Sequence, residues 1–561
     1  MSGLDPIELQ VVTGALRAGC EEMGAVLIRS AHSSNIKERR DASTALFDRH
    51  GEMTMQAEHI PVHLGSMPAA VAAVLDEDHS DGMPWVLNDP FAGGTHLPDI
   101  TVITPVLAPD GGELLGFAAS RAHHADVGGR IPGSMPADSS TLAEEGVVIG
   151  PTRLDEPTLR ELAAQMRQPA EREADLRAQL AANRLGASRL RELARRIGPD
   201  RLHEATSAVL DYAERRTRAC IAALPDGERV AEDVLEAAEG DLVLRLRATV
   251  AGERLILDFG GSAGRHAGNL NCPLAVTRSA CLFAVRVLTD PDIPPSAGAY
   301  RPIEIVAPEG SLLNARPGEA PAGARPAMAA GADAQAAGAN AQAADGGSST
   351  GADGGSSRPA AEGPGTLARG ESSADARAIA PAVAAGNVET SSRVADLVLA
   401  AFGRAQGQGT MNNLTLGDGG FSYYETVGGG QGACPDADGP SGVHVAMSNT
   451  LNTPIEALER EFPLRVLEYG LRRGSGGGGA HRGGDGIVRE IEALRELTFS
   501  LIAERRRHPP RGAAGGEPGL RGRDLLDGRP IAGKATGVLK AGGRLRIETP
   551  GGGGHGPAPP E

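Results

Sequence analysis

Residues 85–107 read WVLNDPFAGGTHLPDITVITPVL, and they combine the local patterns on which the fold depends. The apolar run at the start predicts one strand, and the alternating apolar residues at 101–107 predict another. The glycine-rich loop between the two strands contains a His-x-x-Asp unit, formed by His96 and Asp99. Because junctions between strands and loops often present side chains into clefts, we expect both residues to face a cleft.

Two further polar stretches extend this pattern. A second His-x-x-Asp unit, His123 and Asp126, follows an expected strand at 114–119, and Asp41 lies in a charged stretch nearer the N-terminus. Imidazoles and carboxylates suit a divalent ion such as Zn²⁺, Mn²⁺ or Fe²⁺, which can activate water when one position stays open. A single His-x-x-Asp unit is common, so spacing alone leaves metal binding and a structural role as equal alternatives.

Hairpins and helices alternate irregularly along the chain, which predicts an α+β fold, a large intertwined body with several subdomains. Helices are expected at 5–31, where Asp5 can cap the first turn, and through 156–224. Residues 317–380 contain few large apolar side chains, which predicts a disordered Ala/Gly/Ser-rich insertion. The predicted regions are a metal-bearing α+β region at 1–155, a helical region at 156–228, a hairpin and helix region at 229–316, the insertion at 317–380, a C-terminal α+β region at 381–550 and a flexible tail at 551–561.

Composition excludes several classes of protein. The chain has 561 residues and a net charge of −17, and a field of this sign repels nucleic acid. Its five cysteines include no CxxC pair, which argues against a structural zinc site or a disulfide framework. No apolar run reaches the roughly 18 residues of a membrane span, and the first residues lack the pattern of a signal peptide. We therefore expect a cytoplasmic protein.

Several blocks of sequence resemble signatures of the hydantoinase B/5-oxoprolinase family. The blocks occur in order and cover most of the chain outside 317–380: residues 63–67, 88–99, 122–135, 145–146, 386–390, 411–413, 424–426 and 449–454. The resemblance implies four ligands for a divalent metal: Asp41, His96, Asp99 and His123. It also implies that His124 and Asp126 orient a ligand imidazole or shuttle a proton. His123 and His124 could exchange these roles, because adjacent side chains usually point apart.

The resemblance also implies a divided mechanism. A hydantoinase A-like partner with an actin-like ATPase fold would phosphorylate the amide oxygen, and the present chain would hydrolyse the activated cyclic amide within a hetero-oligomer. The chain has no Gly-x-x-x-x-Gly-Lys-Ser/Thr motif, which fits ATP binding by the partner. Two alternatives to this amidohydrolase remain: an ATP-dependent ketone carboxylase subunit, as for acetone and acetophenone, with the same metal site, and a non-catalytic scaffold.

Other residues have less specific patterns. Glu145 or Asp126 could act as the general base, although Glu145 could equally cap a helix or hold a loop. His59 and His63 are four residues apart and could bind metal, contact substrate or pack in the core. Arg39 could bind a carboxylate or phosphate of the substrate, or belong to a surface charge cluster.

Overall fold

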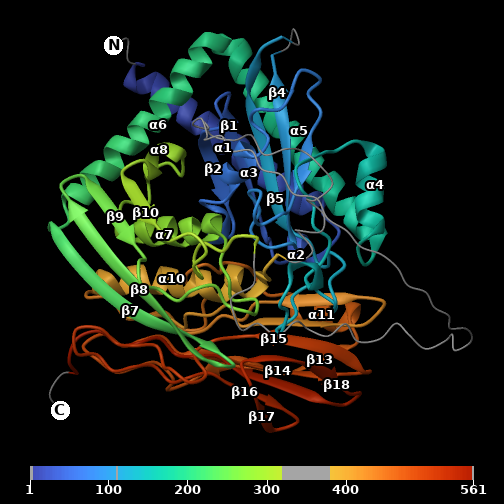
Figure 1. The fold of residues 1–561 in the computed structure, drawn as a ribbon, viewed down its shortest axis with the longest axis vertical. Helices are drawn as coiled ribbons and strands as arrows, with labels where there is room; N and C mark the ends of the chain where they lie inside the picture. The colour runs from blue at the N-terminus through green and yellow to red at the C-terminus, as the bar shows by residue number, and fades with distance from the viewer. Residues whose placement is uncertain (1–3, 109–111, 319–379, 559–561) are drawn as a thin grey trace, which may run out of the picture.

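The computed structural model describes residues 4–108, 112–318 and 380–558 of the chain. Helices and four β-sheets are mixed through these residues, which confirms the α+β fold (Figure 1). The predicted insertion falls outside the described residues apart from its ends. We call residues 4–318 the N-terminal half and residues 380–558 the C-terminal half. None of the described helices has the length and apolar character needed to cross a bilayer.

The N-terminal half contains a six-stranded antiparallel sheet with the strand order β2-β1-β5-β4-β3-β6. Its strands are β1 (Ala42–Asp48), β2 (Met53–Glu58), β3 (Trp85–Leu87), β4 (Asp99–Leu107), β5 (Leu114–His123) and β6 (Thr152–Arg153). The strands predicted at 101–107 and 114–119 are confirmed, but β4 already begins at Asp99 and β5 extends to His123. Pairing with neighbouring strands holds these polar ends in the sheet, which local sequence patterns could not predict.

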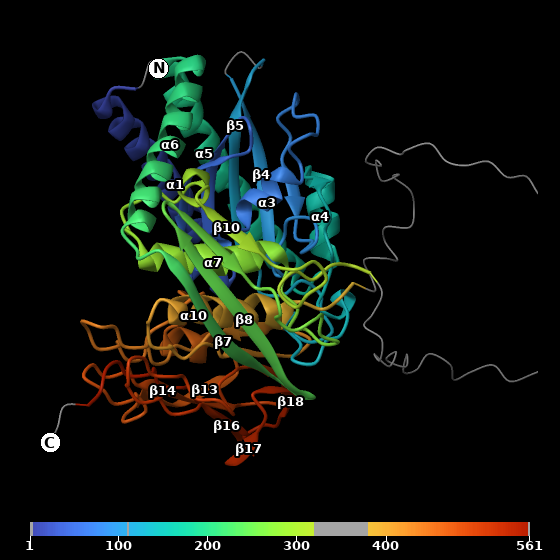
Figure 2. The ribbon, with the colours of Figure 1, turned by 60° about the vertical axis from the view of Figure 1, so that its left-hand side comes forward.

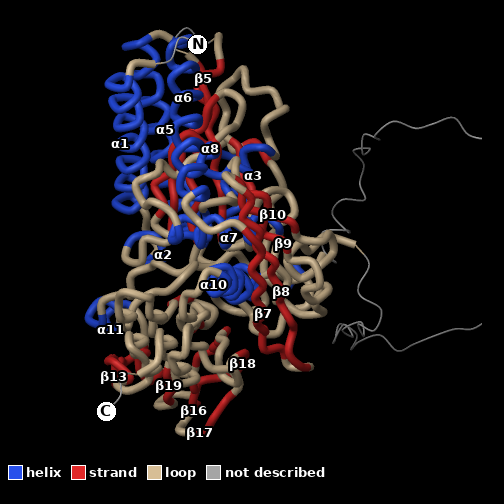
Figure 3. Tube along the Cα trace, turned by 90° about the vertical axis from the view of Figure 1, so that its left-hand side faces the viewer, coloured by secondary structure: helices blue, strands red, loops and turns tan. Residues whose placement is uncertain are grey.

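The two faces of this sheet have different coverings. The helices of this half are α1 (Pro6–Ser30), α2 (Ser34–Lys37), α3 (Met67–Ala72), α4 (Glu156–Ala164), α5 (Pro169–Ile197) and α6 (Pro199–Ala222), which confirms the predicted helical segments. Figure 3 shows α1, α5 and α6 gathered along one side of the molecule. Ala118 and Ala122 of β5 share a core with α1 and α5, whereas Phe117 and Ala119 share a core with α3. Alternation along β5 therefore places His123 on the face opposite α1 and α5.

A second sheet lies where the two halves meet. Its order is β10-β9-β8-β7, formed by β7 (Gly227–Ala237), β8 (Gly240–Ala251), β9 (Arg254–Asp258) and β10 (Ile303–Val306). The neighbouring helices are α7 (Leu274–Leu288), α8 (Ala297–Tyr300) and, from the C-terminal half, α10 (Ser391–Ala401). Figure 2 shows β7 and β8 as a long ribbon passing α7 and α10. One hydrophobic core joins the halves here, with Leu244 and Val276 from the first half and Val394 and Met411 from the second.

The C-terminal half contains two further sheets, of order β12-β11-β15-β18 and β13-β14-β19-β16-β17. Their strands, with the helix α11 (Ile455–Glu461), are β11 (Asn413–Gly417), β12 (Ser422–Glu425), β13 (Leu464–Arg472), β14 (Gly486–Ala493), β15 (Leu497–Ile502), β16 (Arg523–Leu526), β17 (Arg529–Ile531), β18 (Lys534–Leu539) and β19 (Arg544–Glu548). Leu416, Phe499 and Ile547 share the core that these two sheets bury.

Glycine-rich segments outside these strands pack backbone against backbone. The backbone N–H of Gly552 donates to the carbonyl of Gly484 (2.9 Å), and that of Gly477 donates to the carbonyl of Gly552 (2.9 Å). A Cβ on Gly552 would lie 2.0 Å from the carbonyl oxygen of Gln431. Residues 551–554 are buried, so the tail predicted as flexible is packed here, because only glycine lets backbones approach this closely.

We expect Gly552→Ala to lower the free energy of unfolding by roughly 1–3 kcal/mol, because the added methyl group would force packed backbones apart. Gly419→Ala is the matched control, since no atom lies within 4 Å of the position that its methyl group would occupy. The control should change stability by less than about 0.5 kcal/mol. Denaturant unfolding followed by circular dichroism measures both, and equal effects would contradict the packing argument.

Candidate metal centre

Strand β5 ends where β1 and β4 begin. His123 pairs with Asp99 across β5 and β4, and its backbone N–H donates to the carbonyl of Asp41 just before β1 (3.0 Å). Side chains in register on adjacent strands share a face, so these three residues form one row on the face opposite α1 and α5. Sheet pairing thus joins three segments that are far apart in sequence.

The carboxylate of Asp99 lies at the centre of this group. Its Oδ1 is 3.1 Å from His96 Nε2 and 3.3 Å from His123 Nδ1. Its Oδ2 accepts a hydrogen bond from Thr95 Oγ1 (2.6 Å) and lies 3.5 Å from His63 Nε2. One ligand atom from each of His96, Asp99 and His123 lies within 4.8 Å of the others, and the three side chains are at most 2% exposed.

The loop that carries His96 is fixed by buried contacts. Asn88 Nδ2 donates to the carbonyl of Leu97 (2.8 Å), and the buried Arg121 donates from Nη2 to the carbonyl of Gly93 (3.0 Å). Gly93 has a φ of +97°, and a Cβ there would lie 2.4 Å from the carbonyl oxygen of Ala69. A glycine is therefore required where this loop passes α3, and the loop is held in place beside β4.

The charges of this group suit a bound cation. Burial alone would raise the pKa of Asp99, but the imidazoles of His96, His123 and His63 hold it well below its ordinary value. Burial lowers the pKa of His123 despite the nearby carboxylates of Asp99 and Asp41. An ionised carboxylate beside a neutral imidazole is the protonation state in which both groups act as metal ligands.

The imidazole nitrogens test whether a metal fits. Both ring nitrogens of His96, Nε2 of His123 and Nε2 of His63 are buried without a hydrogen-bond partner among the described residues. Buried polar groups are usually bonded, so these nitrogens have capacity for a ligand. A mixed set of imidazole and carboxylate donors fits Zn²⁺, Mn²⁺ or Fe²⁺, as the sequence predicts.

Two residues differ from their predicted places. The carboxylate of Asp41 is not among the ligand atoms that lie within 4.8 Å of one another, although its backbone begins the same row. It therefore stays a predicted ligand. His63 lies closer to the centre than a general packing role required, because its Nδ1 is 2.9 Å from Ser43 Oγ and its Nε2 faces Asp99.

His124 and Asp126 lie away from the cluster. His124 Nε2 is 3.0 Å from Gln179 Oε1 on α5, and burial lowers the His124 pKa to about 4. Strand alternation therefore favours His123 as the ligand. Both carboxylate oxygens of Asp126 are used by its own loop: they pair with Arg167 (3.0 Å) and accept the N–H of Gly133 (2.8 Å). This bonding indicates a structural role for Asp126 instead of the predicted base or orienting role.

Glu145 holds a loop, which was one of its predicted alternatives. It accepts hydrogen bonds from the backbone N–H of Val383 (3.1 Å) and Ala384 (3.0 Å) and from Ser139 Oγ (2.8 Å). Burial raises its pKa to about 7, and His96 opposes that shift electrostatically. Ser139 also lines a cavity of about 640 Å³, so Glu145 connects the surroundings of His96 with this space.

His59 and Arg39 pack in the interior. A Cβ on Gly24 of α1 would lie 2.9 Å from His59 Cε1, so this ring contacts the helix. Arg39 is fully buried, and its guanidinium donates to the carbonyl of Tyr424 (2.7 Å) and to Thr450 Oγ1 (3.0 Å). Arg39 thus joins the two halves, and the predicted surface charge cluster is wrong for this residue.

Sequence reasoning gave no role to Tyr424 or Arg121. Tyr424 stacks on His123, with ring centroids 4.5 Å apart and an interplanar angle of 13°. Arg121 donates from Nε to Thr101 Oγ1 (2.7 Å) and from Nη1 to Ser66 Oγ (2.5 Å). Its position two residues before His123 in a predicted strand could have placed Arg121 on the same face.

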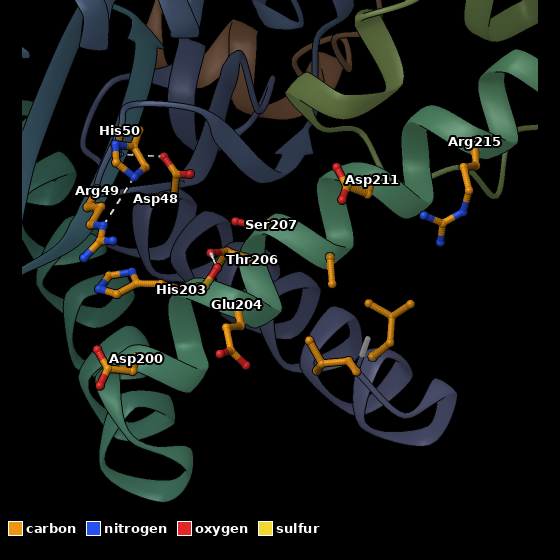
Figure 4. A pocket seen from close by; sticks show the side chains of 13 residues that line it. Asp48, Arg49, His50, Asp200, His203, Glu204, Thr206, Ser207, Asp211 and Arg215 are labelled. Carbon is orange, nitrogen blue, oxygen red and sulfur yellow. Dashed lines mark hydrogen bonds between the residues drawn. The ribbon is translucent and has the colours of Figure 1, made fainter. Parts of the chain in front are cut away.

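A separate cleft of about 880 Å³ lies between the β1–β2 turn and α6 (Figure 4). Its lining includes Asp48, Arg49 and His203, and His203 Nε2 is 3.1 Å from Glu113 Oε1. None of the predicted metal ligands lines this cleft. Size alone therefore does not mark it as the site of the chemistry.

Comparison with known proteins identifies the family. The profile described as Hydantoinase B/oxoprolinase matches residues 5–378 and 366–558. The chain belongs to the hydantoinase B/oxoprolinase family. It is 36% identical to 5-oxoprolinase 1 of Arabidopsis thaliana, a match that covers 98% of this chain and 42% of that protein. It is 29% identical to a putative D-/L-hydantoinase subunit of Pseudomonas sp. (strain NS671), over 92% of this chain and 83% of that one.

Solved structures of the family share the fold. The ATP-dependent caprolactamase from Pseudomonas jessenii is 26% identical, with a TM-score of 0.81 over 99% of this chain and 92% of that chain. An acetone carboxylase in its nucleotide-free form has a TM-score of 0.78 over 98% of this chain and 76% of that one, but at 17% identity it shows the fold alone. The chain spans about two fifths of the length of several relatives, including 5-oxoprolinase 1 (42%) and the Dictyostelium discoideum 5-oxoprolinase (40%).

We expect His123→Ala to weaken Zn²⁺ binding by at least about a hundredfold, whereas His124→Ala should retain the wild-type affinity. His124→Ala should still be less stable, because Gln179 Oε1 would lose its buried partner. Equilibrium dialysis with elemental analysis measures the first effect, and thermal unfolding measures the second. Loss of Zn²⁺ by the His124 variant alone would contradict the assignment.

Glu389 lies in the π-helical turn η3 (Gly386–Thr390), and burial raises its pKa to about 7. A carboxyl whose folded pKa is raised stabilises the fold below its unfolded value of about 4.5, and this contribution is lost as the pH rises through 7. Stability should therefore fall from pH 5.5 to 7.5, and Glu389→Gln should remove roughly 2 kcal/mol of that fall. Denaturant unfolding in chelator measures it, and identical slopes would sink the prediction.

Proposed function

We propose that this chain is the metal-dependent hydrolytic subunit of a two-component, ATP-dependent amidohydrolase that acts on a cyclic amide. The observation that carries the proposal is the buried group of His96, Asp99 and His123, whose imidazole nitrogens lack partners among the described residues. The names of relatives support the reaction class, since they include 5-oxoprolinases and a caprolactamase. A divalent ion held there would lower the pKa of water bound to it toward neutrality.

The residues around the centre would have distinct roles. Asp99 would supply a carboxylate oxygen, with Thr95 holding the other oxygen through its hydroxyl. His96 and His123 would supply imidazole nitrogens, and Asp41 is the proposed fourth ligand. Glu145 is the favoured proton acceptor of the two predicted bases, because its pKa is about 7 and it interacts electrostatically with His96.

Substrate access and ATP binding are assigned by two observations. The side chains of the centre are at most 2% exposed, so a substrate would approach through an internal space such as the 640 Å³ cavity beside Ser139. Its walls include Leu270 and Ile531, which suit the apolar part of a lactam ring. Since 5-oxoprolinase 1 is more than twice as long as the match, we assign ATP to a hydantoinase A-like partner subunit that this chain does not contain.

We expect the complex with such an ATPase subunit to hydrolyse 5-oxoproline, a hydantoin or a larger lactam in the presence of ATP. His96→Ala should lose bound Zn²⁺ and hydrolysis together while its circular dichroism stays unchanged, and His203→Ala, outside the centre, should lose neither. Mass spectrometry of the products measures hydrolysis. Turnover of ketones that requires bicarbonate would indicate the carboxylase instead, and full turnover by the His96 variant would indicate a scaffold.

A further inference from the structure

The aromatic ring of Tyr424 belongs to a different sheet from the residue that it contacts. Tyr424 lies on β12 in the C-terminal half, is buried, and stacks on the imidazole of His123, which ends β5 in the N-terminal half. The ring centroids are 4.5 Å apart and the planes differ by 13°. His123 therefore contributes one ring edge to Asp99 and one ring face to Tyr424.

Three independent contacts hold the Tyr424 ring. Its hydroxyl donates to Asn413 Oδ1 (2.6 Å), and the Asn413 amide lies 3.4 Å from Glu389 Oε1. Its carbonyl accepts from Arg39 Nη1 (2.7 Å), and the Arg39 guanidinium lies 4.5 Å from the ring centroid. Arg39 is itself bound to Thr450, so the ring is fixed by segments from both halves. A ring held in this way cannot follow a neighbour that rotates.

Stacking limits the orientation of the His123 imidazole. The second side-chain torsion of histidine is broad, so a strand position alone does not fix the ring plane. In the stacked orientation Nδ1 lies 3.3 Å from Asp99 Oδ1, whereas Nε2 has no partner in the described part of the chain. Rotation of the imidazole would break the parallel contact with Tyr424 and move Nδ1 away from Asp99.

We propose that Tyr424 is a positioning residue of the metal centre: its ring holds the His123 imidazole in the orientation that binds the ion. This inference rests on the proposed metal centre. It means that the N-terminal half supplies the ligands while the C-terminal half sets the geometry of one of them. Groups that orient a histidine ligand typically change metal affinity by about tenfold to a hundredfold.

The test compares Co²⁺ binding by full-length variants, using equilibrium dialysis and the visible absorption of the bound ion. Tyr424→Leu removes the ring, and we expect Co²⁺ affinity to fall by about tenfold to a hundredfold with a changed spectrum. Tyr424→Phe keeps the ring and should restore nearly wild-type affinity and spectrum. Should Tyr424→Leu fail to fold, Tyr424→Met provides the same loss of the flat ring with a more adaptable side chain.

Tyr423→Leu is the matched control on the same strand. Tyr423 is also fully buried, but its ring packs on Phe462 at 5.1 Å within the C-terminal core. Its substitution should lower thermal stability and leave the Co²⁺ spectrum unchanged. Wild-type affinity in both Tyr424→Leu and Tyr424→Met, or equal losses in the Tyr423 and Tyr424 variants, would overturn the positioning role. Absence of Co²⁺ binding by the wild type would instead overturn the metal centre and this inference with it.

Discussion

The carboxylate of Asp99 is buried among three imidazoles, and the surrounding structure can be understood from the need to stabilise it. A buried ion is strongly unfavourable unless hydrogen bonds and opposite charges compensate for its lost hydration. Here Thr95 donates one hydrogen bond, and His96, His123 and His63 approach both oxygens. Neutral imidazoles only partly compensate an ionised carboxylate, so a divalent cation would complete the electrostatics of the group.

The same centre depends on the packing of the two halves. Arg39 is a buried cation from the N-terminal half whose acceptors, Tyr424 and Thr450, belong to the C-terminal half. A second buried network crosses the boundary where Arg505 pairs with Asp233 of β7 (2.8 Å). Removing one partner from such pairs leaves an uncompensated buried charge, which is strongly destabilising. The halves should therefore separate only with loss of both stability and site geometry.

Local patterns were sufficient for part of this structure. The helices, the hairpins and the α+β class follow from apolar periodicity and turn residues, and the cluster of His96, Asp99 and His123 follows from donor chemistry and resemblance to a family. Patterns failed where a side chain has two plausible partners: Asp126 holds its own loop through Arg167. They also failed for the glycines at 551–554, because backbone packing between remote segments leaves no periodic signal.

The sequence by itself determined the kinds of donor available, the family and the places where strands give way to loops, because these depend on neighbours in the chain. The tertiary structure alone decided that His123 faces Asp99 while His124 faces α5, and that Tyr424 covers His123. The physical reason is register: strand pairing and alternation fix which side chains share a face, and pairing depends on contacts between residues far apart in sequence.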